Sequence, residues 1–416
     1  MKISNTFFFV LARFSAPGAA FVLMPIMTRY MPSEDLGTFY LMSTFLSICL
    51  PLCSYSASSF LVTMYPRYDS FANKHYPCVF TYVAISIPTS ILLLIVYYFV
   101  YPDTKTSLLF SFFCILFTKE LCSTYLCRYQ VEMQGLKYFL YASCLSFVEV
   151  TFVVATIIVM SKLTVELRFF SQALPLIVLS TFVSYNALAW LKDNRLKLKT
   201  IKTFAESMVQ FHLGASVVAM CMPLMFGADK IMVAKLIDIE SVGQYGVNFQ
   251  LCGVYGILVS GIIMAFMPKI SRVLSLKGQR GQYVKKKLFI QYATILIFLA
   301  IFVAMALVVA GHWVLGDNVE LDPLLIIGFT LGQLVFGLLQ FDFISLQKKK
   351  KISYITLSFI LATLFNVAIS YLLIREMGLL GASVGTLISC LVLLIFLNVL
   401  NKKQDNVSIY HIGNGK

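Results

Sequence analysis

The sequence predicts an all-α polytopic membrane protein with about twelve transmembrane helices, arranged as two parallel-related six-helix lobes around a central cavity. Of its 416 residues 59% are hydrophobic and only 12% are charged, and the mean hydropathy is +0.84. Globular domains are about 45–50% apolar and about a quarter charged. The apolar residues also gather in long continuous runs, which favours membrane helices over the alternating strands of a membrane barrel.

Twelve apolar runs follow one another along the chain, each long enough for one crossing of about 20 residues. They fall at 7–29, 38–62, 78–101, 107–127, 139–160, 168–190, 208–229, 246–267, 288–310, 323–346, 353–374 and 378–400. The first run is too long for a signal peptide and carries Arg13 within it, so we expect it to remain as a span. Since only short polar stretches separate the runs, function is expected inside the bundle or in short loops.

Basic residues predict which side of the membrane holds the termini. Twelve spans place both termini on one side. Of the 33 Lys and Arg residues, 24 fall in the tails and loops of that side and seven in the opposite loops. Because cytoplasmic loops are enriched in Lys and Arg, we expect both termini in the cytoplasm. The net charge of +14 therefore reflects topology, and no nucleic-acid partner is expected.

A repeated pattern predicts the duplication of a six-helix unit. A basic residue, a glutamate and a glycine follow the first run and recur after the seventh with the same spacing. They are Arg29, Glu34 and Gly37, then Lys235, Glu240 and Gly243. Six helices separate the copies, so both have the same orientation and are related by an axis along the membrane normal. The alternative is that such residues are simply common at helix ends.

The repeat divides the chain into an N-terminal lobe at 1–190, a C-terminal lobe at 208–400 and a cytoplasmic tail at 401–416. Between the lobes, residues 191–207 space Leu196, Leu198, Ile201 and Phe204 among five basic residues. This pattern is typical of an amphipathic helix on an anionic membrane surface. It either tethers the lobes or attracts an anionic lipid headgroup.

The sequence offers no enzyme constellation, so neither catalytic residues nor a cofactor nor a metal is expected. It contains no Cys–His metal spacing, no glycine-rich phosphate loop and no nucleophile elbow. Only His212 among the four histidines lies within an apolar run. The ten cysteines lie within the runs or at their ends, so a disulfide framework is not expected either.

Ionisable residues at membrane depth are candidate functional residues, because each costs about 2.5–3.5 kcal/mol on insertion scales. Arg13 either snorkels to the cytoplasmic surface or faces the cavity. Lys119 and Glu149 lie at similar depths on adjacent antiparallel runs, which predicts a structural ion pair. Glu149 is alternatively a protonatable carboxylate for ion coupling.

Three further charges are candidates. Asp342 lies one turn from the cytoplasmic end of its run, either paired at the surface or available for ion coupling. Lys230 either pairs with Asp229 beside it or points into the cavity opposite Arg29. Arg13, Arg29 and Lys230 are therefore candidate cations of the cavity.

Three segments, taken in order, resemble the superfamily of multidrug, oligosaccharidyl-lipid and polysaccharide exporters. They are the exit of the first run at 29–40, the stretch from Asp229 to Tyr245, and the glycine-rich start of the last run at 378–389. Within this superfamily the chain is most similar to the Wzx-type polysaccharide flippases. The sixth run lacks a counterpart of the glycine-rich start, which blurs the duplication there.

The resemblance implies a function in O-antigen or other surface polysaccharide synthesis at the bacterial inner membrane. The substrate would be an undecaprenyl-diphosphate-linked oligosaccharide, moved from the cytoplasmic to the periplasmic leaflet by alternating access. The basic residues that bind substrate in the family's cavity would correspond to Arg13, Arg29 and Lys230. Implied partners are membrane lipids, a polysaccharide polymerase and a chain-length regulator. The alternatives are a drug or cation antiporter of the same superfamily and, from another class, a membrane polysaccharide polymerase.

Overall fold

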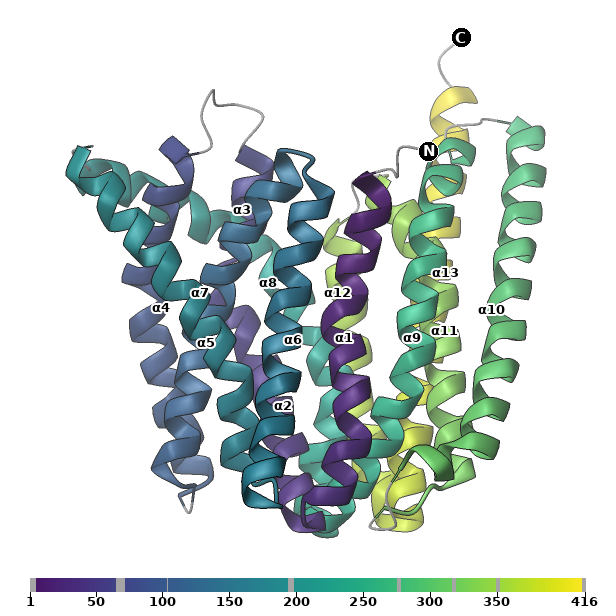
Figure 1. The fold of residues 1–416 in the computed structure, drawn as a ribbon. Coiled ribbons are helices and arrows are strands. Elements are labelled where there is room, and N and C mark those ends of the chain that lie inside the picture. Colours follow the sequence, from purple (N-terminus) through teal and green to yellow (C-terminus); the bar gives the residue numbers. More distant parts are fainter. Residues whose placement is uncertain are drawn as a thin grey trace. The chain divides into compact units, whose positions relative to one another are not determined.

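The computed structural model describes residues 5–64, 72–102, 104–193, 198–274, 278–315, 319–348 and 352–413. These residues form thirteen helices (Figure 1). The helices are α1 (Asn5–Tyr30), α2 (Ser33–Ser54), α3 (Ala57–Met64), α4 (Ala72–Val100), α5 (Thr106–Val131), α6 (Gly135–Met160), α7 (Val165–Asp193), α8 (Leu198–Leu236), α9 (Ile239–Val273), α10 (Gly278–Val314), α11 (Pro323–Lys348), α12 (Ile352–Met377) and α13 (Leu379–Gly413).

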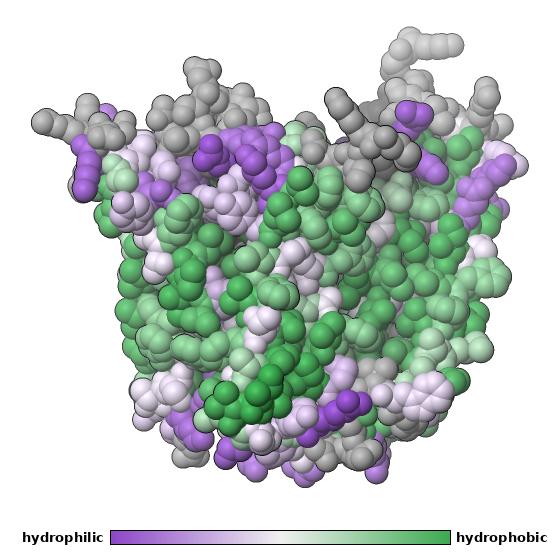
Figure 2. All heavy atoms as spheres, in the orientation of Figure 1, coloured by the Kyte–Doolittle hydropathy of each residue, from purple (hydrophilic) through white to green (hydrophobic). Residues whose placement is uncertain are grey.

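Twelve of the described helices are long and apolar enough to cross a membrane. Hydrophobic side chains cover the middle of the helices and hydrophilic ones collect near their ends (Figure 2). The apolar middle matches the hydrocarbon core of a bilayer, and the helices bond their backbone polar groups internally, as hydrocarbon requires. The twelve predicted spans are confirmed in number and type.

The chain divides into two compact units, Met1–Met220 and Cys221–Lys416. The first contains α1 to α7 and the beginning of α8, and the second contains the rest of α8 and α9 to α13. The boundary lies within α8, and the predicted boundaries at 191–207 remain a prediction. Of that predicted linker, residues 194–197, and with them Leu196, lie outside the described residues, as do residues 414–416 of the tail.

In the first unit α5 is central. It packs against α7, α4, α3 and α2, while α6 packs along α1 (Figure 1). Tyr82, Leu121, Val183 and Met208 are buried together around it. The start of α8 closes this core, because the Phe204 ring lies 6.2 Å from that of Phe60.

In the second unit α11 is central and packs against α13, α9 and α10. Two buried tyrosines of this unit bond across helices to backbone carbonyls. Tyr255 Oη donates to Leu296 O at 3.0 Å, and Tyr292 Oη donates to Gly337 O at 2.7 Å. A buried tyrosine needs such a partner, so these bonds fix the positions of α9, α10 and α11.

Local signals explain the start of α9 and the turn between α12 and α13. Asp238 caps α9 by accepting a hydrogen bond from Ser241 N at 2.6 Å, as an N-cap aspartate does. Gly378, with φ of +61°, makes the turn between α12 and α13 in the left-handed region, where glycine avoids a steric cost. That turn sends α13 back along α12.

One predicted span is not a single helix. The run at 38–62 was expected to cross the membrane unbroken, but the structure ends α2 at Ser54 and begins α3 at Ala57. Between them Tyr55 and Ser56 have φ values of 47° and 49°. Left-handed φ angles are uncommon for residues other than glycine, so the break occurs at a conformation that the surrounding contacts must hold.

Candidate functional site

A polar cleft of about 420 Å³ lies in the first unit, near the end of the helices that holds Asn5. Four helices line it: α1, α3, α5 and α6. The lining residues are Arg13, Ser58, Ser59, Val62, Thr63, Ser123, Leu126, Cys127, Gln130 and Tyr138. The lining therefore combines one cation with several hydroxyls and an amide, which is an unusual set of groups at membrane depth.

The break between α2 and α3 turns a row of hydroxyls toward this cleft. Ser58, Ser59 and Thr63 all belong to the short helix α3, which starts just after the break. If α2 continued straight, the direction of these side chains would be set by the axis of α2 and not by that of α3. The break therefore builds one wall of the cleft.

Glu120 of α5 holds the start of α3 in place. Its Oε1 accepts two hydrogen bonds, from Ser58 N and from Ser58 Oγ, each at 2.8 Å. A carboxylate at a helix N-terminus bonds otherwise unpaired N–H groups and meets the positive end of the helix dipole. Because α3 has only eight residues, it depends on this cap more than a long helix would.

The other side of the break contacts α8. Ser56 Oγ lies 3.2 Å from His212 Nδ1, and the rings of Tyr55 and His212 are 5.1 Å apart. His212, expected from the sequence as a polar residue within a span, is thus a packing partner of the break. Its exposed fraction is 6%, so it is not positioned to meet a large substrate.

Arg13, one of the predicted substrate-binding cations, lines the cleft and is exposed there. Arg29, the second, lies in the last turn of α1. Sixteen residues of helix separate the two, which corresponds to about 24 Å along the axis. One diphosphate cannot contact both arginines at once, so the structure does not bring these two candidates together.

Lys230, the third candidate cation, is buried inside the second unit. Its exposed fraction is 8% and its Nζ lies 4.5 Å from the centroid of the Phe249 ring. An ammonium over an aromatic face gains cation–π attraction. Its assignment to substrate binding remains a prediction.

The predicted pair of Lys119 and Glu149 is corrected by the structure. Glu149 is bound by Arg168 of α7 instead, with Nη1 to Oε1 at 2.8 Å. Lys119 is exposed and forms no ion pair within the described residues. Arg168 lies in the first turn of α7, at the beginning of the predicted run 168–190.

Arg168 is the most deeply buried cation of the first unit, with an exposed fraction of 2%. Its Nη1 also donates to Ser171 Oγ at 3.0 Å, and its guanidinium lies 5.2 Å from the Phe39 ring centroid. Glu149, a predicted candidate for ion coupling, is therefore neutralised by a buried arginine. Removing one member of a buried pair typically costs about 3–5 kcal/mol, which identifies a structural role.

An exposed ion pair joins the beginnings of α5 and α7. Lys105 Nζ lies 2.6 Å from Glu166 Oε1. The hydrogen bond to Glu166 raises the pKa of Lys105 above its usual value. Both residues lie at the opposite end of the helices from the polar cleft.

The second unit contains a buried acidic centre that the sequence did not reveal. Asp229 has an exposed fraction of zero. Its Oδ2 accepts hydrogen bonds from Tyr245 Oη, at 3.2 Å, and from Thr386 Oγ1, while its Oδ1 has no partner. The carboxylate is thus only half satisfied by protein groups, although unpaired buried polar atoms are expensive.

Further unpaired polar atoms belong to α12. Both side-chain amide atoms of Asn366 and the hydroxyl of Ser370 lack hydrogen-bond partners although both residues are buried. Ser370 lies beside the Asp229 carboxylate, and Asn366 is one turn earlier on the same helix. Such a cluster offers oxygen ligands to a hard cation, or a carboxylate to a proton.

Asp342, the other predicted coupling candidate, is partly buried in α11, close to the end of that helix. It is six residues from Lys348, whose Nζ bonds Ser271 O of α9.

The sequence could have pointed to the Asp229 centre instead through Asn366, an amide in the middle of an apolar run. Amides more often join helices, so that signal was weak.

Solved structures share this fold, whereas no family model and no curated protein matches the sequence. The lipid II flippase MurJ, in an inward closed conformation, has a TM-score of 0.68 at 12% identity, covering 95% of this chain and 87% of that one. An inward-facing multidrug resistance MATE transporter of the MOP superfamily has 0.62 at 13%, covering 96% and 95%. A Vibrio cholerae MATE transporter has 0.58 at 12%, covering 96% and 95%.

These similarities define the fold of the protein. The chain has the two-lobed, twelve-span fold shared by MATE transporters and MurJ, which confirms the predicted fold class. Each of the three similar structures is a transporter or a flippase rather than an enzyme. At identities of 12–13% the similarity establishes the fold, and the cargo has to be argued from the residues of this chain.

Proposed function

We propose that the protein translocates an undecaprenyl-diphosphate-linked oligosaccharide from the cytoplasmic to the periplasmic leaflet of a bacterial inner membrane. Transport would follow alternating access and supply repeat units for O-antigen or related surface polysaccharide. The observation that carries the proposal is the cleft in which Arg13 lies among the hydroxyls of Ser58, Ser59 and Ser123.

The cleft matches the head of such a lipid in chemistry. An arginine fork binds phosphate oxygens through two parallel hydrogen bonds, and hydroxyls and amides replace water around sugars. A diphosphate-linked sugar entering hydrocarbon alone would lose its water bonds at several kcal/mol per group. The cleft supplies partners of the required types, while a polyprenyl tail can stay in lipid.

The membrane potential supplies part of the driving force. Each charge moved across 100 mV gains about 2.3 kcal/mol, so outward transfer of two negative charges gains about 5 kcal/mol. Of the acidic residues, we assign additional cation or proton coupling to Asp229, because one of its oxygens is buried without a partner. Glu149 is less suited to coupling because Arg168 already neutralises it.

The proposal retains the partners and location that the resemblance implied. Membrane lipids surround the helices, and a polymerase with a chain-length regulator would consume the exported units. Both termini would lie in the cytoplasm, on the side of the Arg13 cleft. Labelling of single cysteines placed near each terminus, in intact and in permeabilised cells, tests this orientation.

A drug or cation antiporter is the second candidate. The observation that favours it is the buried carboxylate of Asp229, since antiporters exchange a cation or proton at such a group. The exposed Arg13 in the cleft disfavours it, because a cationic drug would be repelled there. A membrane polymerase is the remaining alternative, for which the described residues offer no catalytic cluster.

Deletion of the gene separates these candidates. A flippase mutant accumulates single, unpolymerised lipid-linked units on the cytoplasmic face, where an added glycosidase reaches them only after permeabilisation. A polymerase mutant accumulates the same units on the periplasmic face. An antiporter mutant shows normal polysaccharide and greater drug sensitivity. Either of the last two results would overturn the proposed function.

A further inference from the structure

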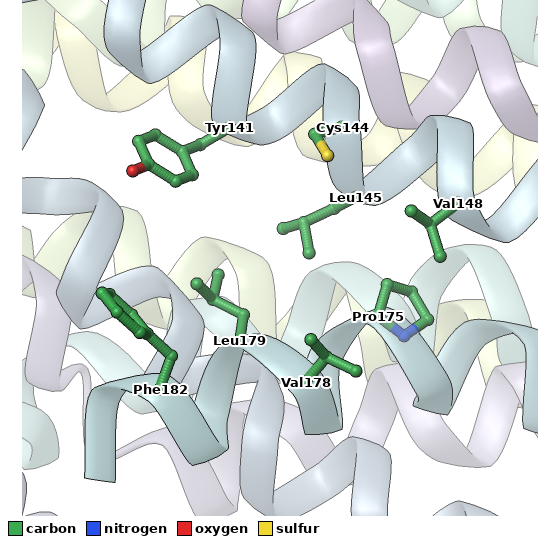
Figure 3. A pocket seen from close by; sticks show the side chains of 8 residues that line it. All are labelled: Tyr141, Cys144, Leu145, Val148, Pro175, Val178, Leu179 and Phe182. Carbon is green, nitrogen blue, oxygen red and sulfur yellow. The ribbon is translucent and has the colours of Figure 1, made fainter. Parts of the chain in front are cut away.

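A second pocket lies in the first unit, between α6 and α7, with a volume of about 380 Å³. Tyr141, Cys144, Leu145 and Val148 line it from α6, and Pro175, Val178, Leu179 and Phe182 from α7. Figure 3 shows the side chains of the two helices on facing sides of a narrow slot. Apart from the Tyr141 hydroxyl and the Cys144 sulfur, the lining is hydrocarbon.

One helix of the slot, α7, contains a proline at this place. Pro175 of α7 has no N–H with which to complete the helical hydrogen bond to residue 171, and proline bends helices at such positions. Val178 of the slot has an exposed fraction of 61%. The slot is therefore an open apolar groove at membrane depth and not a sealed cavity.

Aromatic rings gather at one end of the groove. The Tyr141 ring stacks on Tyr129 of α5 at 5.2 Å, and Tyr125 contacts Tyr141 at 5.8 Å and Phe182 at 5.7 Å. Tyrosines are enriched at the level of lipid headgroups, because the ring is apolar and the hydroxyl is wet. This end of the groove therefore corresponds to the membrane surface.

Basic residues accompany those rings. Arg128 follows Tyr125 by one turn on α5 and is exposed, paired with Glu132 at 2.9 Å. Lys137 is exposed one turn before Tyr141 on α6. A groove with basic residues at its mouth and hydrocarbon along its length complements an anionic lipid.

The mouth of the groove adjoins the polar cleft. Tyr138 lines the cleft and Tyr141, one turn later on α6, lines the groove. On α5, Gln130 lines the cleft while the neighbouring Tyr129 stacks at the groove mouth. The cleft and the mouth of the groove therefore lie at the same end of α5 and α6, beside the turn that joins these two helices.

We propose that this groove holds the first part of the polyprenyl chain while the diphosphate and sugars occupy the Arg13 cleft. This inference rests on the proposed function and adds a site for the lipid tail to it. From Tyr141 to Val148 the groove follows about 10 Å of α6, or two helical turns. It therefore receives the isoprene units nearest the diphosphate and leaves the rest of the chain in the bilayer.

Photocrosslinking tests the groove directly. The full-length protein is reconstituted in vesicles of phosphatidylethanolamine and phosphatidylglycerol. Trace undecaprenyl phosphate with a diazirine in its first isoprene units is added and activated by light. Labelled peptides are then mapped by mass spectrometry, with unlabelled undecaprenyl phosphate or extra phosphatidylglycerol as competitor. We expect labels at residues 141–148 and 175–182 that only the polyprenyl competitor removes.

Two matched variants sharpen the result. Val178→Trp fills the groove and should lower labelling there about tenfold, equivalent to about 1.4 kcal/mol. Val159→Trp lies on α6 outside the groove, with an exposed fraction of 82%, and should leave labelling unchanged. The unfolding temperature of each variant in detergent verifies that both are folded.

The outcomes separate this inference from the proposed function. Labels elsewhere, or labels that phosphatidylglycerol displaces equally well, overturn the groove proposal and show an ordinary phospholipid site, whatever the transport assays find. Selective groove labelling in a protein whose deletion leaves polysaccharide export intact overturns the proposed function, while the groove keeps its affinity for polyprenyl chains.

Discussion

The two compact units differ in whether their polar side chains line an open cleft or lie buried. The first unit exposes them along a cleft, where Arg13 and the hydroxyls of the broken helix α3 face open space. The second unit buries them around Asp229, among helices that pack closely. There, a Cβ on Gly381 would fall 2.0 Å from Leu373 O, so α12 and α13 approach as closely as a glycine allows.

This difference indicates a division of labour. An open cleft with a cation suits a large anionic head, because such a head needs room and many hydrogen bonds. A closed carboxylate centre admits at most a small cation or a proton. A two-lobed helical fold can therefore support two kinds of site, depending on whether the polar residues of a lobe face a cleft or the interior.

The largest expected effect concerns the ion pair between the buried Arg168 and the half-buried Glu149 in the first unit. Arg168→Ala leaves Glu149 unpaired and should cost about 3–5 kcal/mol of stability. Unfolding temperature in detergent measures the loss. Lys105→Ala is the matched control, because it breaks the exposed pair with Glu166 and should leave the unfolding temperature nearly unchanged. Equal losses in the two variants would contradict a structural role for Arg168.

Removing the buried charge of Asp229 in the second unit should not lower stability, in contrast to Arg168→Ala. Asp229→Asn keeps the side-chain shape but removes a buried charge, so stability should hold or rise while coupled transport falls about tenfold, or 1.4 kcal/mol. Transport with and without a sodium or proton gradient measures the effect. Asp238→Asn is the control, since asparagine also caps helices. Full gradient dependence in Asp229→Asn would remove Asp229 from the coupling role.

A smaller effect is expected at the cap of α3. Glu120→Ala removes the acceptor for both Ser58 bonds and should cost about 0.5–2 kcal/mol. Glu120→Gln retains an acceptor oxygen and should restore most of this stability. Hydrogen exchange of the α3 amides reports the fraying. Identical protection of α3 in the alanine variant and the unmodified protein would show that the cap does not hold the cleft wall.

The smallest effect is expected at Arg29. Because it lies about 24 Å along α1 from Arg13, Arg29→Ala should leave binding of the lipid-linked head to the cleft unchanged. Binding to the reconstituted protein, measured with undecaprenyl diphosphate, checks this. A loss as large as that of an Arg13 variant would mean that the head does not sit in the cleft alone.

The sequence predicted the architecture well, because hydropathy and the spacing of apolar runs depend on local composition. The helix break at Tyr55 and Ser56 was missed because neither residue is a glycine or proline, so no local breaker marks it. The partner of Glu149 was missed for another reason. Depth along the membrane made Lys119 plausible, but helix rotation decides which cation faces the carboxylate.

The candidate sites depended even more on tertiary packing. Arg13 could be singled out, because a charge within an apolar run is conspicuous. The Asp229 centre could not, since Tyr245, Asn366 and Thr386 come from three different helices, α9, α12 and α13. No local sequence pattern distinguishes these residues, and only tertiary packing brings their side chains together.

The central claim is that Arg13 binds the diphosphate of a lipid-linked oligosaccharide during translocation. The direct test is the translocation rate in vesicles with a clamped, inside-negative potential, followed with a lectin that reaches only outward-facing sugars. Arg13→Ala should slow translocation about 10- to 100-fold, equivalent to the 1.5–3 kcal/mol of a charged hydrogen bond, and Arg13→Lys should recover part of it. Equal rates in all three proteins, at equal protein levels, would contradict the account.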